Sequence, residues 1–507
     1  MKLNLNIFCI SAALLVLNSA VLAEDRLVPG VYPTIQAGID AAVDGDTVVV
    51  AQGTYFENVD FGGKSITVTS TAPNEPAATV IDAAGSGTVV TFPDVASANC
   101  VLAGFTVTHG DTSVNGGGML CLNGSIEINN CIISDNSATE NGGGIYIKLA
   151  NLTLNGCVLS RNSAYGVGNL AGGGGIFTRY GGLILTDCQF NDNTAFNSSG
   201  GGIRCTDAEL TLVGSTFVSN SSVREGGGVS TDAERATLTD CKFNGNSAKY
   251  GGGMCNSHRG ATVTNSVFAS NSAERGGGIC TLQIHSGDLS LNNCTFRSNS
   301  ADDFGGAVCD EEGGNSVLTN CIFWDNIAFT EGPQIALEQN GTASVSYCCI
   351  QGGDLDIYTG SGSTLNWLGG NIEVDPVLAN PASGDCHLQS TAGRWDPNRN
   401  DWVYDAVSSP CIDAGDPNSD WTAEPWPNGQ RINMGAFGGT SQASKSPENG
   451  GYIADFDDSG AVDEGDLKII TEKWLIIGIS LREDLYGDET IDLRDFAVFA
   501  KFWGWRE

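Results

Sequence analysis

The stretch CKFNGNSAKYGGGMC, from Cys241 to Cys255, combines an aromatic residue, two asparagines and a glycine triplet. Its first half recurs about eight times along the chain, at intervals of 25 to 31 residues. The copies read CIISDNSA, CVLSRNSA, CQFNDNTA, STFVSNSS, CKFNGNSA, SVFASNSA, CTFRSNSA and CIFWDNIA. Their aligned asparagines are Asn136, Asn162, Asn193, Asn220, Asn246, Asn271, Asn299 and Asn326. This periodicity identifies a repeat protein.

Most copies are followed by a glycine cluster and an apolar residue, as in GGGIYI and GGGVST, and then by alternating segments such as ATLTDCKF. Alternation of apolar and polar residues with a period of two is typical of β-strands. Each repeat is therefore predicted to form one coil of a parallel β-helix. Consecutive coils of such a solenoid lie about 4.8 Å apart.

Stacked coils give each position of the repeat a structural role. The asparagines are expected to bond side chain to side chain along the axis, with the phenylalanines stacked beneath them. The glycines would supply corners with positive φ and allow close passage of the backbone. The predicted stack contains Phe190, Phe217, Phe243, Phe268, Phe296 and Phe323. On this interpretation the motif is architectural.

A column of small residues stands five positions before each asparagine. It contains Cys131, Cys157, Cys188, Ser215, Cys241, Ser266, Cys294 and Cys321. Neighbouring coils would bring a pair such as Cys131 and Cys157 within disulfide range. Because Cys188 and Cys241 face serines instead, we expect mainly free, buried thiols that act as compact core residues.

The first residues predict export. Lys2 precedes the apolar run IFCISAALLVL, and Val21 and Ala23 stand at cleavage positions, so residues 1–23 are predicted to be a secretory signal peptide. No later apolar run is long enough to span a bilayer. We therefore expect a secreted protein, extracellular or associated with a cell surface.

Charge restricts the possible partners. The formal net charge is −35, which argues against nucleic acid, because phosphate binding depends on Lys and Arg. The same charge would repel acidic polysaccharides unless a metal or a local basic patch intervenes.

Residues 24–440 are predicted to form the β-helix with an N-terminal cap, its repeats covering about residues 100–340. The cap segment YPTIQAGIDAAVDGDTVVVAQGTYFENV predicts a short amphipathic helix, a turn at Asp44–Asp46 and a strand. The expected buried face of the helix carries Ile35, Ile39, Ala42 and Val43. Beyond the repeats, residues 343–440 are interpreted as the last irregular coils and the C-terminal closure, and residues 441–451 as a polar linker.

The cap and first coil resemble those of the pectin-lyase-like β-helix superfamily. The repeats resemble the polymorphic outer-membrane protein repeats found in bacterial adhesins. These resemblances imply an all-β fold, a right-handed parallel β-helix solenoid, followed here by a small helical domain. They imply no particular activity, because one fold hosts many functions.

The segment DFDDSGAVDEGD, near the C-terminus, has the spacing of a calcium loop. Oxygen ligands at alternating positions wrap one hard cation, and the glycine at position 6, Gly460, makes the sharp turn. The predicted ligands are Asp455, Asp457, Ser459, the carbonyl of Ala461, Asp463 and Asp466. The sequence therefore predicts bound Ca²⁺.

A second loop, DLYGDETIDLRD, keeps part of this pattern. Tyr486 stands at position 3, and Glu489 replaces the glycine. Its candidate ligands are Asp484, Asp488, Thr490, Asp492 and Asp495. Whether this loop binds Ca²⁺ is left open.

Each loop leads into a helical pattern, and Asp rather than Glu stands at position 12. Residues 452–507 therefore resemble a type I dockerin. The resemblance implies calcium-dependent folding and docking onto a cohesin-type partner. At loop positions 10 and 11 the two copies differ, with Glu464–Gly465 and Leu493–Arg494, which departs from the symmetry that gives some dockerins two-way binding. The alternative is a calcium-stabilised domain without a partner.

None of the catalytic signatures of the superfamily can be matched in the coils. The segments after the glycine strands carry Arg179, Asp207, Asp232, His258, His285 and Asp310. We expect these residues to lie along one edge, where Asp207 and Asp232 would suit a retaining glycosidase pair. His258 and His285 would extend the same candidate site or hold a metal. The alternative is an ordinary solvated turn.

Three functions remain open from the sequence. The first is a secreted β-helix that binds or presents to polysaccharide or a cell surface and is tethered by its dockerin-like tail. The second is a polysaccharide lyase or glycoside hydrolase, and the third is an adhesin. The first is favoured.

Overall fold

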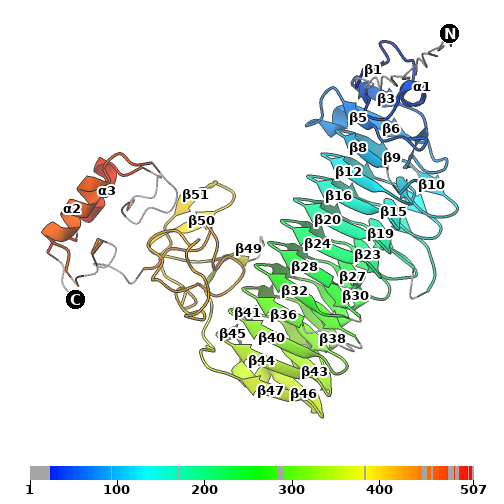
Figure 1. Cartoon of the computed structure of the whole chain (residues 1–507). Helices are drawn as coiled ribbons and strands as arrows, with labels where there is room; N and C mark the ends of the chain where they lie inside the picture. The colour runs from blue at the N-terminus through cyan, green and yellow to red at the C-terminus, as the bar shows by residue number, and fades with distance from the viewer. Residues whose placement is uncertain are drawn as a thin grey trace, which may run out of the picture.

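The computed structural model contains a stack of β-coils, an irregular segment beside it and a small helical module at the C-terminus (Figure 1). It describes residues 23–504, apart from 93, 97, 169–170, 234, 258, 283–288, 382–383, 448–453, 458, 460, 478–482, 484, 486–489 and 501.

One coil consists of four short strands. In a typical coil these are β12 (Ser125–Asn129), β13 (Ile132–Ser134), β14 (Ser137–Ala138) and β15 (Ile145–Lys148). Each strand pairs in parallel with its counterpart one coil later, as β12 does with β16 (Asn151–Asn155). Repetition builds four parallel sheets of 14, 12, 9 and 12 strands, here called sheets 1 to 4 in the order β12, β13, β14, β15. The predicted parallel β-helix is confirmed.

Alternation along the strands creates the core. In β12, Ile126 and Ile128 are buried, whereas Ser125 and Glu127 are exposed. Successive side chains of a strand point to opposite faces, so every coil sends its apolar residues inward. The resulting core is one continuous cluster from Val28 to Ile357.

The predicted asparagine ladder is present along the whole series. Asn136 Nδ2 donates to Asn162 Oδ1 at 3.0 Å, and the same bond links each later pair down to Asn299 and Asn326. Each amide also donates to a backbone carbonyl of the preceding coil, as Asn162 Nδ2 does to Ile133 O at 2.8 Å. These buried amides are therefore satisfied by their neighbours above and below.

The phenylalanine stack is also confirmed. From Phe190 to Phe323, ring centroids of successive coils lie 4.6–4.9 Å apart with nearly parallel planes. The glycine clusters allow this close stacking. A Cβ at Gly202 would lie 2.5 Å from Gly228 O, so a larger residue would force the coils apart.

All cysteines in the described part of the chain are free and buried. Burial raises the pKa of Cys131 and of Cys241 to about 12. The expectation of compact, unpaired core thiols is therefore confirmed for these residues.

The N-terminal cap contains β1 (Asp25–Val28) and α1 (Ile35–Ala41), which precede β2 (Thr47–Val50). Thr34 caps α1 by accepting a hydrogen bond from Ala37 N. Of the four expected core residues, Ile35, Ile39 and Ala42 are buried, but Val43 is 45% exposed. The prediction for Val43 is wrong because the helix ends at Ala41, and the chain turns before Val43 can face the core.

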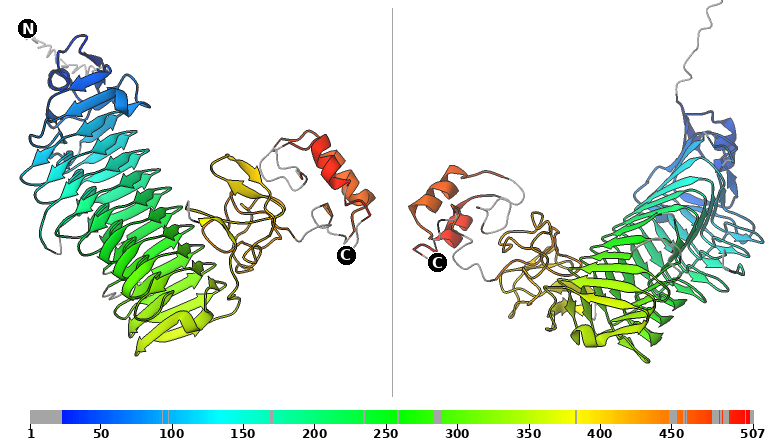
Figure 2. Two further views of the ribbon diagram at one scale, coloured as in Figure 1. Left: turned by 180° about the vertical axis from the view of Figure 1, so that it is seen from behind. Right: turned by 60° about the horizontal axis from the view of Figure 1, so that its bottom comes forward.

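Regular coils continue to β46 (Ile357–Ser361) and β47 (Thr364–Trp367). Residues 343–440 were predicted to form the last irregular coils and the C-terminal closure. The segment after β47 instead leaves the end of the stack uncovered. Figures 1 and 2 show it beside the coils, and its core residues, including Leu378, Cys411 and Met434, pack onto outward-facing residues of sheet 2 such as Ile322. The apolar outer face of sheet 2 at this level accounts for the difference. We call residues 376–447 the flanking segment.

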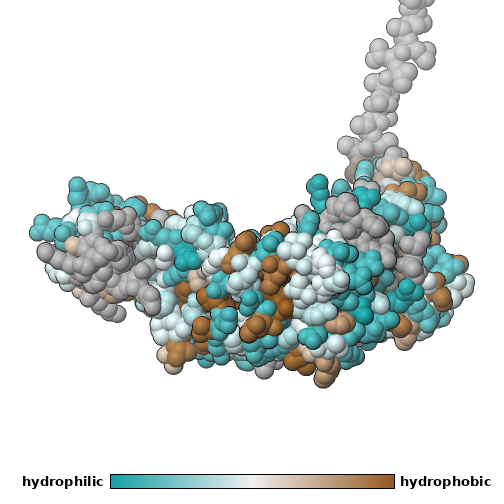
Figure 3. Space-filling view, turned by 90° about the horizontal axis from the view of Figure 1, so that it is seen from below, coloured by the Kyte–Doolittle hydropathy of each residue, from teal (hydrophilic) through white to brown (hydrophobic). Residues whose placement is uncertain are grey.

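The flanking segment contains two short antiparallel pairs. β48 (Leu378–Asn380) pairs with β49 (Asp385–Leu388), and β50 (Arg394–Asp396) pairs with β51 (Asp401–Val403). At the end of the coil stack, Leu355, Leu368 and Val374 are exposed. Seen from below (Figure 3), hydrophobic residues gather over the middle of the molecule, where this end faces the viewer.

The C-terminal module contains α2 (Glu464–Glu472) and α3 (Leu493–Phe499). Its small core is formed by Ala454, Phe456, Val462, Ile470, Ile491 and Phe499. Within the described residues, no helix is sufficiently long and apolar to cross a membrane.

Candidate functional site

Three carboxylates of the first predicted calcium loop converge. One oxygen from each of Asp455, Asp457 and Asp466 lies within 4.8 Å of the others. Asp455 and Asp466 are fully buried, whereas Asp457 is exposed. Three like charges at this separation repel one another, so the arrangement favours a cation between them.

Backbone hydrogen bonds hold the loop in shape. Asp455 Oδ1 and Asp457 Oδ1 both accept from Ser459 N, at 3.0 and 3.1 Å. Ser459 Oγ donates to Ala461 O at 3.1 Å, which brings the candidate ligands at positions 5 and 7 together. Carboxylates, a hydroxyl and a backbone carbonyl are the oxygen donors that Ca²⁺ uses, so these residues fit that ion.

Helix capping explains only part of this arrangement. Asp463 accepts from Gly465 N, and Asp466 Oδ2 accepts from Asp463 N at 2.9 Å, which forms a capping box at the start of α2. A capping box requires neither Asp455 nor Asp457. Their approach to Asp466 is therefore a feature that capping leaves unexplained and that a bound cation would explain.

The second loop is described only in part. Asp492 and Asp495 form the equivalent capping box at the start of α3, and Thr490 bridges to Ile477. Asp484 and Asp488 lie outside the described residues, so their place relative to Asp492 and Asp495 is untested. The likeness of the two loop–helix units extends to their caps.

The predicted alignment of polar residues along one edge of the coils is wrong: the residues of successive coils are offset from the expected register. Ile203 of β23 (Ile203–Thr206) pairs with Val229 of β27 (Val229–Asp232), which sets Asp232 opposite Thr206 rather than Asp207. The glycine clusters determine this register, and Asp207 stands one residue farther from its cluster than Asp232 does. Alignment of the two TDAE segments, which places Asp207 beside Asp232, misses this offset.

Asp207 and Asp232 nevertheless lie close together. Asp207 N donates to Asp232 Oδ1 at 3.1 Å, and Asp232 Oδ2 lies 3.2 Å from Arg204 Nη2. Asp207 pairs separately with Arg179, at 3.6 Å. Each carboxylate thus has a guanidinium partner of its own.

The other members of the expected edge do not extend this pair. Asp310, in β39 (Val308–Asp310), pairs in register with Thr281, one row away from Asp232, and is buried. Burial raises the pKa of Asp310, against the effect of hydrogen bonds from Ser316 and Thr281. His258 and His285 lie outside the described residues.

An ion cluster on the same side was missed by the sequence analysis. Arg275, at the end of β34 (Ser272–Arg275), lies 2.6 Å from Glu311, 3.0 Å from Glu338 and 3.2 Å from Asp303. The four residues come from three successive coils, so only the coil register could have revealed the cluster.

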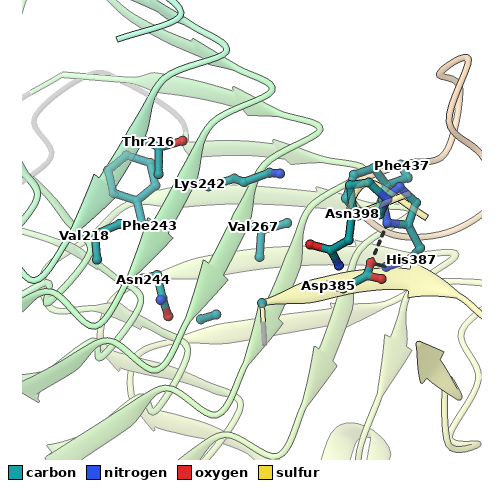
Figure 4. Close-up of a pocket in the computed structure, with 13 residues that line it drawn as sticks. Thr216, Val218, Lys242, Phe243, Asn244, Val267, Asp385, His387, Asn398 and Phe437 are labelled. Atoms are coloured by element: carbon teal, nitrogen blue, oxygen red, sulfur yellow. Dashed lines mark hydrogen bonds and ion pairs between the residues drawn. The ribbon is translucent and has the colours of Figure 1, made fainter. Parts of the chain in front are cut away.

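A pocket of about 250 Å³ lies between sheet 2 and the flanking segment (Figure 4). Sheet 2 contributes Lys242 from β29 (Lys242–Asn244), and the flanking segment contributes Asp385 and His387 from β49. His387 Nδ1 lies 2.6 Å from Asp385 Oδ1, and the imidazole stacks on Phe437 with centroids 3.5 Å apart. The sequence analysis did not identify this site.

Two arginine contacts fix the acidic side of the pocket. Arg394 Nη1 donates to Asp385 Oδ2 at 3.2 Å, and Arg394 Nε donates to Asp405 Oδ2 at 3.0 Å. Burial opposes ionisation of Asp385, but its contacts with His387 and Arg394 outweigh burial and lower its pKa. His387 is 1% exposed, and its Nε2 has no hydrogen-bond partner among the residues that the structure describes.

A family model described as right-handed beta-helix region matches residues 74–231 and 227–375, which is more than half of the chain. The chain belongs to the right-handed β-helix family. No curated protein is detectably similar to this right-handed β-helix protein. A second family model, described as disaggregatase related, matches residues 349–415. That match begins in the last coils and includes Asp385, His387 and Arg394.

Proposed function

We propose that this right-handed β-helix protein is exported, binds or presents to polysaccharide or a cell surface, and is tethered through residues 452–507 to a cohesin-type partner. Tethering in this proposal depends on Ca²⁺. The observation that carries it is the convergence of Asp455, Asp457 and Asp466, which helix capping alone does not require.

The ion would be held by the carboxylates of Asp455, Asp457 and Asp466, with Ser459 and Ala461 O nearby. Bound Ca²⁺ neutralises the acidic loop and thereby couples ion binding to folding of the module. The core of the module is small, with Phe456, Ile470 and Phe499 among its few large buried side chains. A module of this size gains much of its stability from such an ion.

The coil stack supports the binding part of the proposal by its shape. A solenoid presents long, regular outer faces, and extended surfaces of this kind suit polymeric ligands. Export is proposed from the signal-peptide pattern of residues 1–23.

Calcium titration of purified residues 24–507 tests the tether. The full chain is expected to bind Ca²⁺ and, in its presence, to bind a cohesin domain. Asp455→Asn should weaken both, because a charged ligand is replaced by a neutral one. Asp302→Asn, at an exposed position on the coils, is the matched control. Calcium binding that is equally strong in Asp455→Asn would refute the proposed site.

Calcium binding and cohesin binding are measured separately, because the two results together distinguish a dockerin-like tether from a calcium-stabilised domain without a partner. If calcium binds but no cohesin domain does, the module is a calcium-stabilised domain without that partner.

A carbohydrate-active enzyme, a polysaccharide lyase or glycoside hydrolase, is the second candidate. The match to the disaggregatase-related family model favours it. A panel of polysaccharides should be tested for both retention and release of reducing or unsaturated ends. Product release that is lost in Asp207→Ala or Asp232→Ala, with retention preserved, would establish an enzyme. Retention without products supports a binding protein.

A further inference from the structure

We propose that the pocket between sheet 2 and β49 binds the carboxylate of a small polyhydroxylated acid, the chemistry of an acidic sugar residue, through His387 and Lys242. The inference deepens the saccharide-binding part of the proposed function and rests on it for the class of ligand. It does not depend on the calcium module.

The first argument is the state of His387. Its Nδ1 faces Asp385 at 2.6 Å, and its Nε2 is buried without a hydrogen-bond partner in the described part of the chain. The imidazole lines the pocket, and its orientation is fixed by Asp385 on one side and by stacking on Phe437. Buried polar atoms in native proteins nearly always have a partner, so an unpaired one that lines a pocket is a position where a ligand atom can supply that partner.

The second argument is charge. Lys242 is exposed at the pocket and forms no ion pair with any residue that the structure describes. Figure 4 shows its ammonium end extended toward the side where Asn398 and His387 lie. Arg394 pairs with the oxygen of Asp385 that does not face His387, and it also pairs with Asp405. In a chain with a net charge of −35, the pocket is thus a local position that favours an anion.

Both groups line the same pocket, and a carboxylate offers one oxygen to each. One oxygen would accept from Nε2–H of His387 and the other from Lys242 Nζ, as charge-assisted hydrogen bonds. His387 donates through Nε2–H when the imidazole carries both protons, with Nδ1–H directed at Asp385 Oδ1. The charged groups placed around His387 are Asp385 on its own strand, Arg394 on β50 and Lys242 on β29.

The remaining lining suits hydroxyl groups. Thr216, Asn244 and Asn398 provide polar side chains. A pocket of about 250 Å³ has room for one small ring rather than for a chain of them. A cationic end combined with amide and hydroxyl groups matches a single ring that carries both a carboxylate and several hydroxyls.

Isothermal titration of the full mature chain, residues 24–507, tests the inference. The probes are D-glucuronate and D-galacturonate, compared with glucose, acetate and inorganic sulfate. Lys242→Met removes the ammonium at an exposed position. His387→Asn keeps a donor toward Asp385 and removes Nε2. Lys249→Met, on sheet 3 of the same coil, is the control.

At least one hexuronate is expected to bind, and each pocket variant should weaken it about tenfold or more, as loss of a charge-assisted bond implies. Lys249→Met should bind as the unchanged protein does.

Absence of binding by the folded protein, or binding unaffected by Lys242→Met, overturns the inference. Acetate that binds as well as the hexuronates refutes the sugar assignment, and stronger binding of sulfate refutes the carboxylate. If polysaccharide retention survives both pocket variants while no hexuronate binds, the pocket inference fails and the proposed function stands. If the unchanged protein retains no polysaccharide, the polysaccharide-binding part of the proposed function is refuted instead.

Discussion

The side-chain amide of Asn220 donates to Asn246 Oδ1 at 3.0 Å, and Asn246 donates in turn to Asn271 Oδ1 at 2.9 Å. Asn246 Oδ1 also accepts from Asn220 N. One side chain therefore satisfies groups of two neighbouring coils and connects three.

Asn246→Ala is expected to lower the free energy of unfolding by about 2–4 kcal/mol, because it leaves buried donors of Asn220 without an acceptor. Denaturant titration followed by circular dichroism measures the change. Asn244→Ala, two residues earlier and exposed, should change stability by less than about 0.5 kcal/mol. Equal effects of the two substitutions would contradict the structural role of the ladder.

Removal of calcium is expected to unfold residues 452–507 and to leave the coils intact. The acidic loop loses the cation that offsets repulsion among Asp455, Asp457 and Asp466, whereas the coil core contains no such cluster among the described residues. Hydrogen exchange with and without a chelator measures this difference. A chelator that also removed protection from the asparagine ladder would contradict two independent modules.

The cysteines predict a simple thiol titration. In the native mature protein, the 16 described cysteines are buried and should react slowly with a thiol reagent at neutral pH. After denaturation without reductant, all of them should react. A reduced sample in denaturant provides the reference count. A shortfall of two thiols would indicate a disulfide, and Cys349 and Cys411, which share one hydrophobic cluster, are the first pair to replace.

The stability of the flanking segment is expected to depend on pH through the buried carboxyl of Glu424. Its Oε1 accepts from Asn433 N at 2.8 Å and Gly439 N at 2.7 Å, and burial raises the pKa of this carboxyl to about 8. Because the folded pKa exceeds the unfolded value, its contribution to stability is complete below the unfolded pKa. That contribution is lost as the pH rises through about 8.

Glu424→Gln keeps the acceptor and removes the ionisation. The variant should therefore gain thermal stability relative to the unchanged protein as the pH is raised from about 5 to about 8, by an amount of order a few kcal/mol at most. Calorimetry at several pH values measures the difference. Glu75→Gln, at an exposed position, should show no such trend, and a flat difference for Glu424→Gln would contradict the raised pKa.

The sequence was sufficient to predict the coil architecture because the same pattern occurs in about eight repeats. The repeat positions of Asn246 and Phe243 are occupied by asparagine and phenylalanine at nearly constant intervals. Each side chain contacts the equivalent residue of the neighbouring coil. The convergence of Asp455, Asp457 and Asp466 was also predictable, since these three carboxylates lie within one short segment.

Register was harder to predict. Asp207 and Asp232 are 25 residues apart, close to one repeat, yet β23 and β27 align through their glycine clusters and set Asp232 opposite Thr206. A shift of one residue along a strand changes which face a side chain occupies. Alignment of the two TDAE segments therefore gave the wrong register for the turn residues.

By itself, the sequence determined the parallel coils, their asparagine and phenylalanine stacks and the acidic loop, because each depends on local spacing or on an exact repeat. Only the tertiary structure decided that residues 376–447 lie against sheet 2 and that Lys242 and His387 share a pocket. These contacts join an irregular segment to the outer face of distant coils. No periodicity encodes them, because they depend on how two apolar surfaces fit together in space.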